Sequence, residues 1–307
     1  MLKPVNENLH TVTIKDIEDH KLITDDELNR DLKNLKRFSA EENANNFYGN
    51  PFLYHFQFKN LLKCRREKGK TIYDIYNDSE AWNKLIDSTR KRNRGGRTPA
   101  GNVYECFRIN LGSIVMFKST TAKYLYKKYG AKHVLDPTAG WGGRLLGAWA
   151  LDIDYTGIDT NTEMVDAYNK MSDYLDNYSD FGNSLLQEER TGKQQMIWQS
   201  CLDVDFGAIN YDFVLTSPPY VNLELYEHMT PWEQDQDFYV NFFIPLWQKC
   251  VNNIKAGGNV CFNISPKMYD DAVKHGLTPC DDEEDLLQQL GQQKGKKKQD
   301  KIYIWKC

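Results

Sequence analysis

The sequence lacks several features that would assign it to a particular class of protein. No apolar stretch approaches the ~20 residues of a membrane-spanning helix, and Met1 to Glu7 contain no apolar segment of a signal peptide. The seven cysteines are scattered, with no C-x-x-C pair and no neighbouring histidine. We therefore expect no zinc site, no disulfide framework, no membrane span and a reducing, cytoplasmic compartment.

A strong excess of one charge is also missing. The net charge is −4, which argues against a uniformly basic nucleic-acid surface but leaves room for local basic patches. Hydrophobic residues make up 40% of the chain, enough for a buried core and a folded globular protein. A length of 307 residues fits one large domain or a catalytic domain with an appendage.

The most informative segment is an apolar run, 211–215, followed by Thr-Ser-Pro-Pro-Tyr at 216–220. A β-type run ended by two prolines predicts a strand that delivers its last residues rigidly to a cleft at its carboxyl end. The Ser217 hydroxyl, the fixed backbone carbonyls and the ring of Tyr220 can together hold a planar group that carries an exocyclic amine. The alternative is a turn after a buried strand.

A second segment combines a predicted strand, 133–135, with a glycine-rich turn, 136–144, and a helix that continues to Ala150. The three glycines of this turn allow the backbone to approach a ligand closely. The turn is not the dinucleotide fingerprint, because its acidic residue, Asp136, precedes the glycines. A carboxylate there suits a cationic amino group better than a pyrophosphate.

Two further strands are predicted to end near acidic residues. The strand 155–159 ends at Asp159, about 20 residues after the glycine-rich turn. A carboxylate offers two acceptor oxygens that match two vicinal hydroxyls, although a helix N-cap is the alternative role for Asp159. The strand 196–199 leads to Asp203.

These segments resemble the S-adenosylmethionine-dependent amino-methyltransferases, which modify N4 of cytosine or N6 of adenine in DNA. Residues 216–220 resemble motif IV, in which Ser is most frequent in the N4-cytosine enzymes and Asp in the N6-adenine enzymes. Residues 136–144 resemble motif I, D-P-F-x-G-x-G, with Thr138 in place of the usual aromatic residue and Trp141 close by. The resemblance implies an α/β, Rossmann-like class I methyltransferase fold with a mixed seven-stranded sheet and helices on both faces.

The resemblance also implies that the cofactor is S-adenosyl-L-methionine. Asp159 then receives the ribose hydroxyls, Asp203 lies near the adenine amino group, and Phe117 belongs to a segment that resembles motif X. The implied cofactor-binding residues are Phe117, Asp136, Thr138, Gly140, Trp141, Gly142, Asp159, Asp203 and Thr216.

The implied catalytic residues are Ser217, Pro218, Pro219 and Tyr220. In this scheme Ser217 and the Pro218 carbonyl hold the amine for direct methyl transfer, and Tyr220 receives the face of a base that is flipped from a duplex or single-stranded. Cofactor motif and amine motif occur in that order, with only about 70 residues between Gly143 and Ser217. This spacing leaves no room for a recognition domain and favours the γ-like arrangement.

Basic and aromatic residues outside these motifs are candidates for nucleic-acid contact. Five cations within 90–97 predict a flexible segment that contacts phosphates, or a solvated loop between domains. Residues 281–300 are predicted to form a mobile loop with a basic end. The candidates are Arg90, Arg92, Arg94, Arg97, Trp232 and Lys296, although Trp232 can equally be buried against the helix predicted at 238–251.

We expect two domains, a mainly helical extension at 1–100 with possible nucleic-acid contact and a methyltransferase domain at 101–307. Thr24 and Glu27 predict a capping box for a helix that carries Leu28, Leu32 and Leu35. Aromatic residues crowd 47–58, and most are expected in a core. Residues 107–118 are expected to be extended, and Ser119 to Thr121 to cap the next helix.

The predicted function is methylation of an exocyclic amino group in DNA, with N4 of cytosine favoured over N6 of adenine. An RNA or protein-glutamine amino-methyltransferase is an alternative, although these use Asn or Asp before Pro-Pro-Tyr. A nucleic-acid-binding protein that has lost catalysis is another. We expect DNA as the partner, no metal, and a bacterial, phage or viral context; a restriction-modification role with a nuclease partner stays open.

Overall fold

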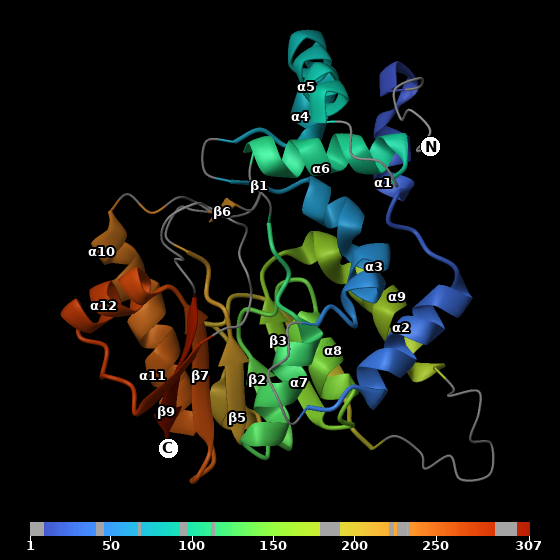
Figure 1. Cartoon of the computed structure of the whole chain (residues 1–307). Helices are drawn as coiled ribbons and strands as arrows, with labels where there is room; N and C mark the ends of the chain where they lie inside the picture. Colours follow the sequence, from blue (N-terminus) through green and yellow to red (C-terminus); the bar gives the residue numbers. More distant parts are fainter. Residues whose placement is uncertain are drawn as a thin grey trace, which may run out of the picture.

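The computed structural model describes residues 9–40, 46–66, 69–92, 97–111, 114–178, 191–220, 224–225, 232, 234–285 and 300–307. A central sheet is covered by helices on both faces, and a group of N-terminal helices lies beyond one end of the sheet (Figure 1). Among the described helices, none combines the length and the apolar character that a membrane span requires.

The central sheet has seven strands in the order β4-β3-β2-β5-β7-β9-β8. The strands are β2 (His133–Asp136), β3 (Asp154–Asp159), β4 (Gln194–Trp198), β5 (Phe213–Thr216), β7 (Asn259–Ile264), β8 (Asp282–Asp285) and β9 (Lys301–Lys306). The five strands from β4 to β7 are parallel, whereas β9 is antiparallel to both β7 and β8. The prediction of a mixed seven-stranded sheet is confirmed, and the chain has the class I methyltransferase fold.

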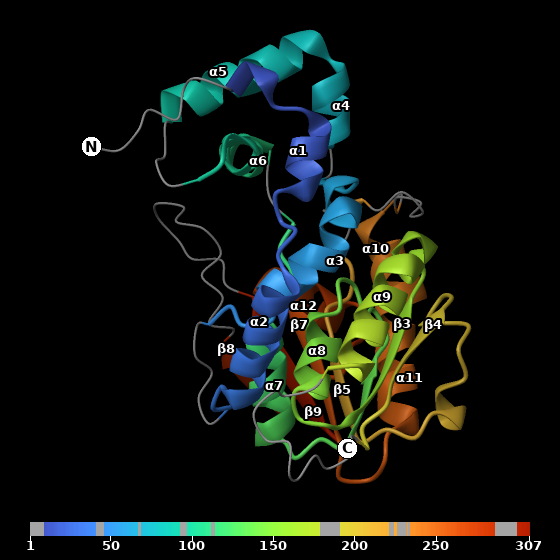
Figure 2. The same cartoon turned by 90° about the vertical axis from the view of Figure 1, so that its right-hand side faces the viewer.

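Alternation along the strands directs side chains into two separate cores. In β5, Phe213 and Leu215 belong to one core, whereas Val214 belongs to the other. The first core is covered by α7 (Ser119–Lys128), α8 (Gly143–Trp149) and α9 (Val165–Asp176), with η2 (Thr162–Met164) before α9. The second is covered by η3 (Phe206–Ala208), α10 (Asp235–Phe238), η4 (Tyr239–Phe243), α11 (Ile244–Asn253) and α12 (Pro266–Lys274). Figure 2 shows α8 and α9 on one side of the strands and α11 on the other.

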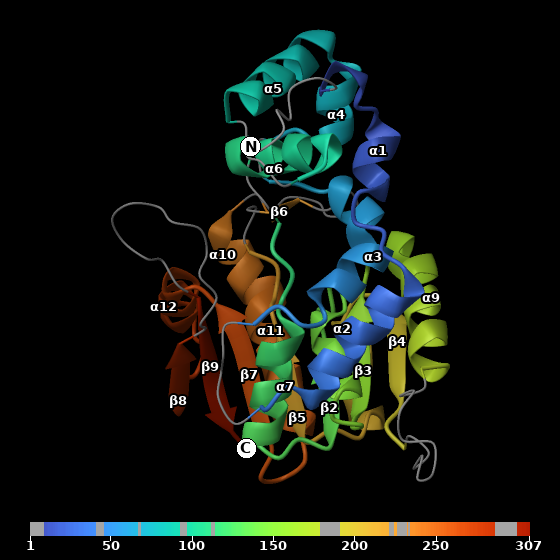
Figure 3. The same cartoon turned by 45° about the vertical axis from the view of Figure 1, so that its right-hand side comes forward.

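The N-terminal part is helical, as predicted, and its helices divide into two sets. The elements are η1 (Leu9–Thr11), α1 (Ile14–Asp19), α2 (Asp25–Arg37), α3 (Asn50–Leu62), β1 (Arg65–Arg66), α4 (Ile72–Asn77), α5 (Ser79–Arg92) and α6 (Pro99–Leu111). Helices α2 and α3 pack together, and α3 packs against α9 on the sheet; α4, α5 and α6 lie together beyond the sheet (Figure 3). Since α6 contacts α1, α5 and η1, the boundary predicted at residue 100 falls inside a helix of the N-terminal group.

Helix α2 begins with the predicted capping box of Thr24 and Glu27, and its leucines are buried. Its Asp31 also fixes the start of α3, because the buried carboxylate accepts hydrogen bonds from the backbone N–H groups of Gly49 and Phe52, each at 3.1 Å. An acidic side chain at a helix N-terminus satisfies donors that have no partner within the helix. Among the aromatic residues at 47–58, Phe52 and Phe58 are buried as expected, whereas Phe47 is exposed.

The prediction of extended backbone at 107–118 is wrong for its first part, because α6 continues to Leu111. Ala100, Val103, Tyr104 and Phe107 are buried at helical spacing, and this packing outweighs the local preference of an apolar run. The helix α7 begins where predicted. Its N-cap is Lys118, however, and no side chain caps it.

The predicted mobile loop at 281–300 begins with an edge strand, β8, which the sequence analysis missed. The strand is acidic and mostly exposed, so it has no apolar alternation. Pairing with β9 brings Glu283 and Asp285 to Lys301, and opposite charges on neighbouring strands compensate for the missing apolar contacts. Residues 286–299 lie outside the described part of the chain.

Candidate active site

Two turns meet where β2 and β5 end at the same edge of the sheet. The hydroxyl oxygens of Thr138, in the glycine-rich turn, and Thr216, at the end of β5, lie 2.6 Å apart. The end of β3 joins them, because the backbone N–H of Gly140 donates to the Asp159 carboxylate at 2.8 Å. The structure therefore brings together the segments that the sequence analysis assigned to the cofactor and to the amine.

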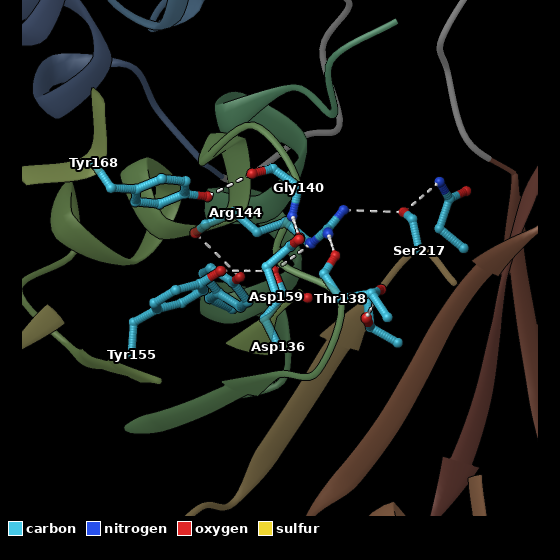
Figure 4. A network of polar contacts seen from close by, with 11 residues as sticks. Asp136, Thr138, Gly140, Arg144, Tyr155, Asp159, Tyr168 and Ser217 are labelled. Carbon is cyan, nitrogen blue, oxygen red and sulfur yellow. Dashed lines mark hydrogen bonds and ion pairs between the residues drawn. The ribbon is translucent and has the colours of Figure 1, made fainter. Parts of the chain in front are cut away.

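Arg144, in the first turn of α8, connects these segments through its guanidinium group. It donates to the Asp136 carboxylate at 2.6 Å, to the backbone carbonyl of Thr138 at 2.5 Å and to the hydroxyl oxygen of Ser217 at 3.0 Å (Figure 4). Burial, the largest single effect, lowers the pKa of Arg144, but the charge and hydrogen bond of Asp136 together with the neighbouring Tyr155 and Tyr126 outweigh it and raise the pKa. Sequence reasoning gave Arg144 no role, although a lone cation in the apolar start of a helix already called for an acidic partner.

Asp136 is completely buried and already has a cationic partner within the protein. Its Oδ2 atom accepts hydrogen bonds from Arg144 and, at 2.7 Å, from the Tyr155 hydroxyl. Its Oδ1 atom has no hydrogen-bond partner in the described part of the chain. The cationic group expected at this carboxylate is thus, in this structure, the guanidinium of Arg144.

The glycines of the turn serve different purposes. A side chain at Gly143 would place its Cβ 1.9 Å from the carbonyl oxygen of Phe117, and one at Gly142 would meet Met171 at 2.8 Å. These two glycines therefore allow close packing within the protein, where the sequence analysis expected a ligand. Gly140 has a positive φ of 58°, and a Cβ added there would have no neighbour closer than 4.0 Å, so the turn is open on that side.

The two aromatic residues predicted to bind the cofactor are both buried. Phe117 lies beside the glycine-rich turn, with its ring centroid 5.2 Å from the guanidinium carbon of Arg144. Trp141 belongs to the core on the side of the sheet covered by α8. Within the described residues, Phe117 is thus next to the predicted site and Trp141 contributes to the packing beneath it.

The carboxylate of Asp159 is held at the end of β3 by two backbone groups. Oδ2 accepts from Gly140, and Oδ1 accepts from Asn161 at 2.9 Å. Burial raises the pKa of Asp159, while these two hydrogen bonds lower it. Each oxygen keeps a lone pair for a further donor. Asp203 is exposed in the turn after β4, where its backbone N–H donates to Ser200.

Ser217 accepts two hydrogen bonds, from Arg144 Nη1 and from Asn263 Nδ2, each at 3.0 Å. Pro218 is buried and Pro219 partly exposed. Tyr220 is partly buried, and its hydroxyl donates to Asp300 at 2.6 Å. Asn263 and Asp300 were not predicted, because they lie on β7 and just before β9, far from the motif in sequence.

The predicted nucleic-acid residues do not form one flexible segment. Arg90 and Arg92 belong to the last turn of α5; Arg90 pairs with Asp87 and Arg92 donates to Asn110. Arg97 lies 3.6 Å from Glu105. The expectation of a flexible segment is therefore wrong for Arg90 and Arg92, because α5 extends further than the charge run suggested.

Of the other three candidates for nucleic-acid contact, the structure describes only Trp232. Arg94 and Lys296 lie outside the described residues. Trp232 is partly buried, with ring contacts to Phe238 and Phe242 at 5.9 and 6.4 Å between centroids. This is the burial that the sequence analysis gave as the alternative to stacking on a base.

The segment after motif IV is attached to the N-terminal helices. Strand β6 (Glu224–Leu225) pairs antiparallel with β1, which follows α3. Figure 1 shows this small sheet between the helices α4 to α6 and the central sheet. Within the described residues, no cluster of three His, Cys, Asp or Glu side chains has the geometry of a metal site.

No protein-family model and no curated protein matches the chain. Among solved structures, an S-adenosylmethionine-dependent methyltransferase from Clostridium acetobutylicum has 11% identity and a TM-score of 0.40, covering 67% of this chain and 98% of its own. An rRNA methylase from Streptococcus thermophilus has 13% identity and a TM-score of 0.37, covering 63% and 99%. An RNA methyltransferase from Salinibacter ruber, in complex with S-adenosyl-L-homocysteine, has 13% identity and a TM-score of 0.36, covering 62% and 93%.

The fold follows from the strand order, the single reversed strand and the helices on both faces of the sheet. These features give the chain the fold of the S-adenosylmethionine-dependent methyltransferases.

Proposed function

We propose that the protein is a DNA methyltransferase that transfers a methyl group from S-adenosylmethionine to an exocyclic amino group of a base, with N4 of cytosine favoured. The observation that carries this proposal is the junction of the two motifs, through Thr138 with Thr216 and through Arg144 with Ser217. A cofactor held by the first motif is then adjacent to an amine held by the second. Such alignment is a large source of rate acceleration in a transfer between two bound groups.

The residues at the edge of the sheet fit the proposed cofactor. The open side of Gly140 admits a ligand to the backbone, and the remaining lone pairs of Asp159 match two vicinal hydroxyls. Asp203 is exposed after the neighbouring strand, at the position that the family resemblance gives to the adenine amino group. S-adenosylmethionine supplies an electrophilic methyl group when bound.

The residues of motif IV serve to orient the target. Ser217 and Pro218 contact the edge of the base that carries the amine, and Tyr220 stacks on its face. The hydrogen bond to Asp300 and the contacts with the second core hold the Tyr220 ring in one place. A target within a duplex must be flipped out of the stack to reach this edge.

The choice of DNA and of cytosine rests on Ser217, because the residue before Pro-Pro-Tyr is most often Ser in the N4-cytosine enzymes that the motif resembles. N6-adenine methylation of DNA is the nearest alternative. RNA or a protein glutamine is a more distant one. In this proposal Arg97, which is exposed between α5 and α6, exchanges its 3.6 Å contact with Glu105 for a contact with a phosphate group.

The test uses the full chain with S-adenosylmethionine carrying an isotopically labelled methyl group. Duplex DNA, single-stranded DNA, RNA and a protein extract are incubated in parallel, digested to nucleosides or amino acids, and analysed by mass spectrometry. We expect labelled N4-methylcytosine from DNA and none with Ser217→Ala. Label only in RNA or in glutamine would refute the DNA assignment, and no labelled product from any substrate would refute the activity.

A further inference from the structure

The hydroxyl oxygen of Ser217 has no capacity left to accept a hydrogen bond. Arg144 Nη1 and Asn263 Nδ2 both donate to it at 3.0 Å, the normal distance for N–H···O bonds. A serine hydroxyl has two acceptor lone pairs and one proton that it can donate. With both lone pairs engaged, only the proton is available for a substrate.

The position of Asn263 follows from the sheet. Strands β5 and β7 are adjacent and parallel, with Thr216 opposite Phe262, so Ser217 and Asn263 are next to each other at the carboxyl edge. Asn263 lies two residues after Cys261 and Ser217 two residues after Leu215, both of which belong to the core covered by α8. On this side Asn263 donates to Ser217, and Arg144 donates to Ser217 from α8.

The polarity of the Asn263 contact also has a physical reason. Asn263 is 7% exposed, and its Oδ1 atom is buried without a hydrogen-bond partner in the described residues. The reversed amide would put its NH2 group at that place. A buried N–H without an acceptor is rarer than a buried carbonyl without a donor, so the orientation that donates to Ser217 is the better one.

Within the described part of the chain, no acceptor receives the proton of Ser217. Ser217 is also partly exposed, unlike Thr216 beside it. The carbonyl of Pro218 likewise accepts no hydrogen bond from the described residues. The motif therefore presents one donor and one acceptor on adjacent residues.

We propose that Ser217 acts as a hydrogen-bond donor to the target base, and that Arg144 and Asn263 are positioning residues that hold it in this role. This inference rests on the proposed function and reverses the role first expected for Ser217, which was to accept from the amine. The amine donates to the Pro218 carbonyl instead.

The donor and acceptor define the chemical class of the target. In cytosine, N3 is an unprotonated ring nitrogen next to the carbon that bears the amine, and in adenine N1 has the same relation to its amine. Ser217 donates to this ring nitrogen while Pro218 accepts from the amine, which is the pattern of a partner on the Watson–Crick edge of the flipped base. The pair orients the target, and no proton is transferred between Ser217 and the base.

The first test requires no substrate. Neutron diffraction from deuterium-exchanged crystals of the full chain, with S-adenosyl-L-homocysteine added as a probe, locates the deuteron on Ser217. We expect it to point away from both Arg144 and Asn263, with the two amide deuterons of Asn263 on the atom nearest Ser217. A deuteron directed at the Asn263 carboxamide oxygen would overturn the inference, whatever the protein methylates.

The second test measures methyl transfer to DNA by Asn263→Asp and Asn263→Ala. The carboxylate of the isosteric variant accepts the Ser217 proton, so we expect turnover to fall on the order of 10- to 100-fold, the loss of one hydrogen bond to the target. The alanine variant leaves the proton free and should retain more activity. A purely structural role predicts the opposite order, because alanine removes more contacts.

Asn259→Asp is the matched control, since Asn259 is the first residue of the same strand, at the end away from the site. It should transfer methyl groups like the wild type. Cofactor affinity and thermal unfolding of all three variants separate folding defects from lost donation. A turnover of Asn263→Asp equal to or higher than that of Asn263→Ala would overturn the inference. A wild-type protein without activity on DNA would refute the proposed function, and the neutron result would then decide the role of Ser217.

Discussion

The hydroxyl oxygens of Thr138 and Thr216 lie 2.6 Å apart, although the residues are 78 positions apart in the chain. Thr138 belongs to the turn after β2, and Thr216 is the last residue of β5. The hydrogen bond between them sets the distance between the two turns, and Arg144 reinforces it by bonding Thr138 and Ser217. Disturbing either contact should therefore affect both halves of the proposed site.

Thr138→Val tests this junction. The substitution keeps the shape but removes the hydroxyl, so Thr216 is left without its partner, and we expect a loss of about 1 kcal/mol in the free energy of unfolding. We also expect several-fold weaker binding of S-adenosylmethionine, measured by isothermal titration calorimetry, because the turn loses its fixed position.

The double variant Thr138→Val and Thr216→Val should be less destabilised than the sum of the single variants, because each single change already breaks the same bond. Thr156→Val is the control, since Thr156 also takes part in a hydrogen bond, with Gln195, but within the sheet. It should lower stability without changing cofactor affinity. Additive effects at 138 and 216 would contradict the predicted coupling.

Asp159→Asn tests the acidic residue at the end of β3. The amide of the variant keeps one acceptor oxygen, but its NH2 group faces the backbone N–H of Gly140 or of Asn161, to which the wild-type carboxylate accepts. We therefore expect the affinity for the cofactor to fall about 10-fold or more. Burial raises the pKa of Asp159 above its ordinary value. The wild type should therefore lose affinity as the pH falls through a window above the usual aspartate range.

Asp159→Asn should lose the pH dependence of cofactor affinity, because it has no carboxylate at this position to protonate. Calorimetric titrations of both proteins at neutral pH and at successively more acidic pH make the comparison. Asp205→Asn is a suitable control, since the Asp205 carboxylate also accepts a backbone N–H bond, from Gly207 at the start of η3. Retention of full affinity by Asp159→Asn at every pH would show that the carboxylate is not a ligand.

The sequence predicted the sheet well where local signals and burial agree. β7 and β9 begin and end where their apolar runs do, and the glycine-rich turn lies between β2 and α8. The prediction from the sequence failed where a strand is stabilised mainly by its neighbouring strand. β8 is acidic, and only the opposing charges of β9 give it a place in the sheet.

The candidate site was predictable as a set of segments but not as a network of contacts. Ser217 stands out because of the two prolines that follow it, whereas Asn263 and Asp300 contact Ser217 and Tyr220 only after the sheet has formed. No local pattern marks either residue. The glycines of the turn were recognised from the sequence, but only the folded chain shows that they differ. The Phe117 carbonyl packs against Gly143, whereas a Cβ added at Gly140 would have no close neighbour.

Tyr220→Phe and Tyr220→Ala separate the hydroxyl of Tyr220 from its ring. The phenylalanine variant keeps the stacking surface but loses the 2.6 Å hydrogen bond to Asp300, so we expect a decrease in turnover of about 10-fold or less. The alanine variant also loses stacking on the base, which is worth roughly 1–3 kcal/mol. Its turnover on duplex DNA should fall about 10-fold further.

Steady-state rates on single-stranded and duplex DNA measure both effects, and cofactor affinity is the internal control. Asp300→Asn should resemble Tyr220→Phe, because the amide is a weaker acceptor for the tyrosine hydroxyl. Undiminished turnover of the alanine variant on duplex DNA would rule out the stacking role.

His20 makes the stability of the N-terminal helices depend on pH. Its ring contacts Phe58 and Tyr104, and its Nδ1 atom lies 3.1 Å from the Ile17 carbonyl. Burial, with a smaller contribution from the charge of Lys21, lowers the pKa of His20 from 6.5 to about 4. The unfolded chain therefore binds a proton between these two pH values that the folded chain does not, so the free energy of unfolding falls as the pH decreases from 6.5 to 4.

The full shift in the pKa of His20 corresponds to a loss of up to about 3 kcal/mol in the free energy of unfolding. Urea unfolding at several pH values across this window should show the loss in the wild type and a smaller one in His20→Gln, whose amide does not titrate. The same pH dependence in both proteins would assign the loss to other groups.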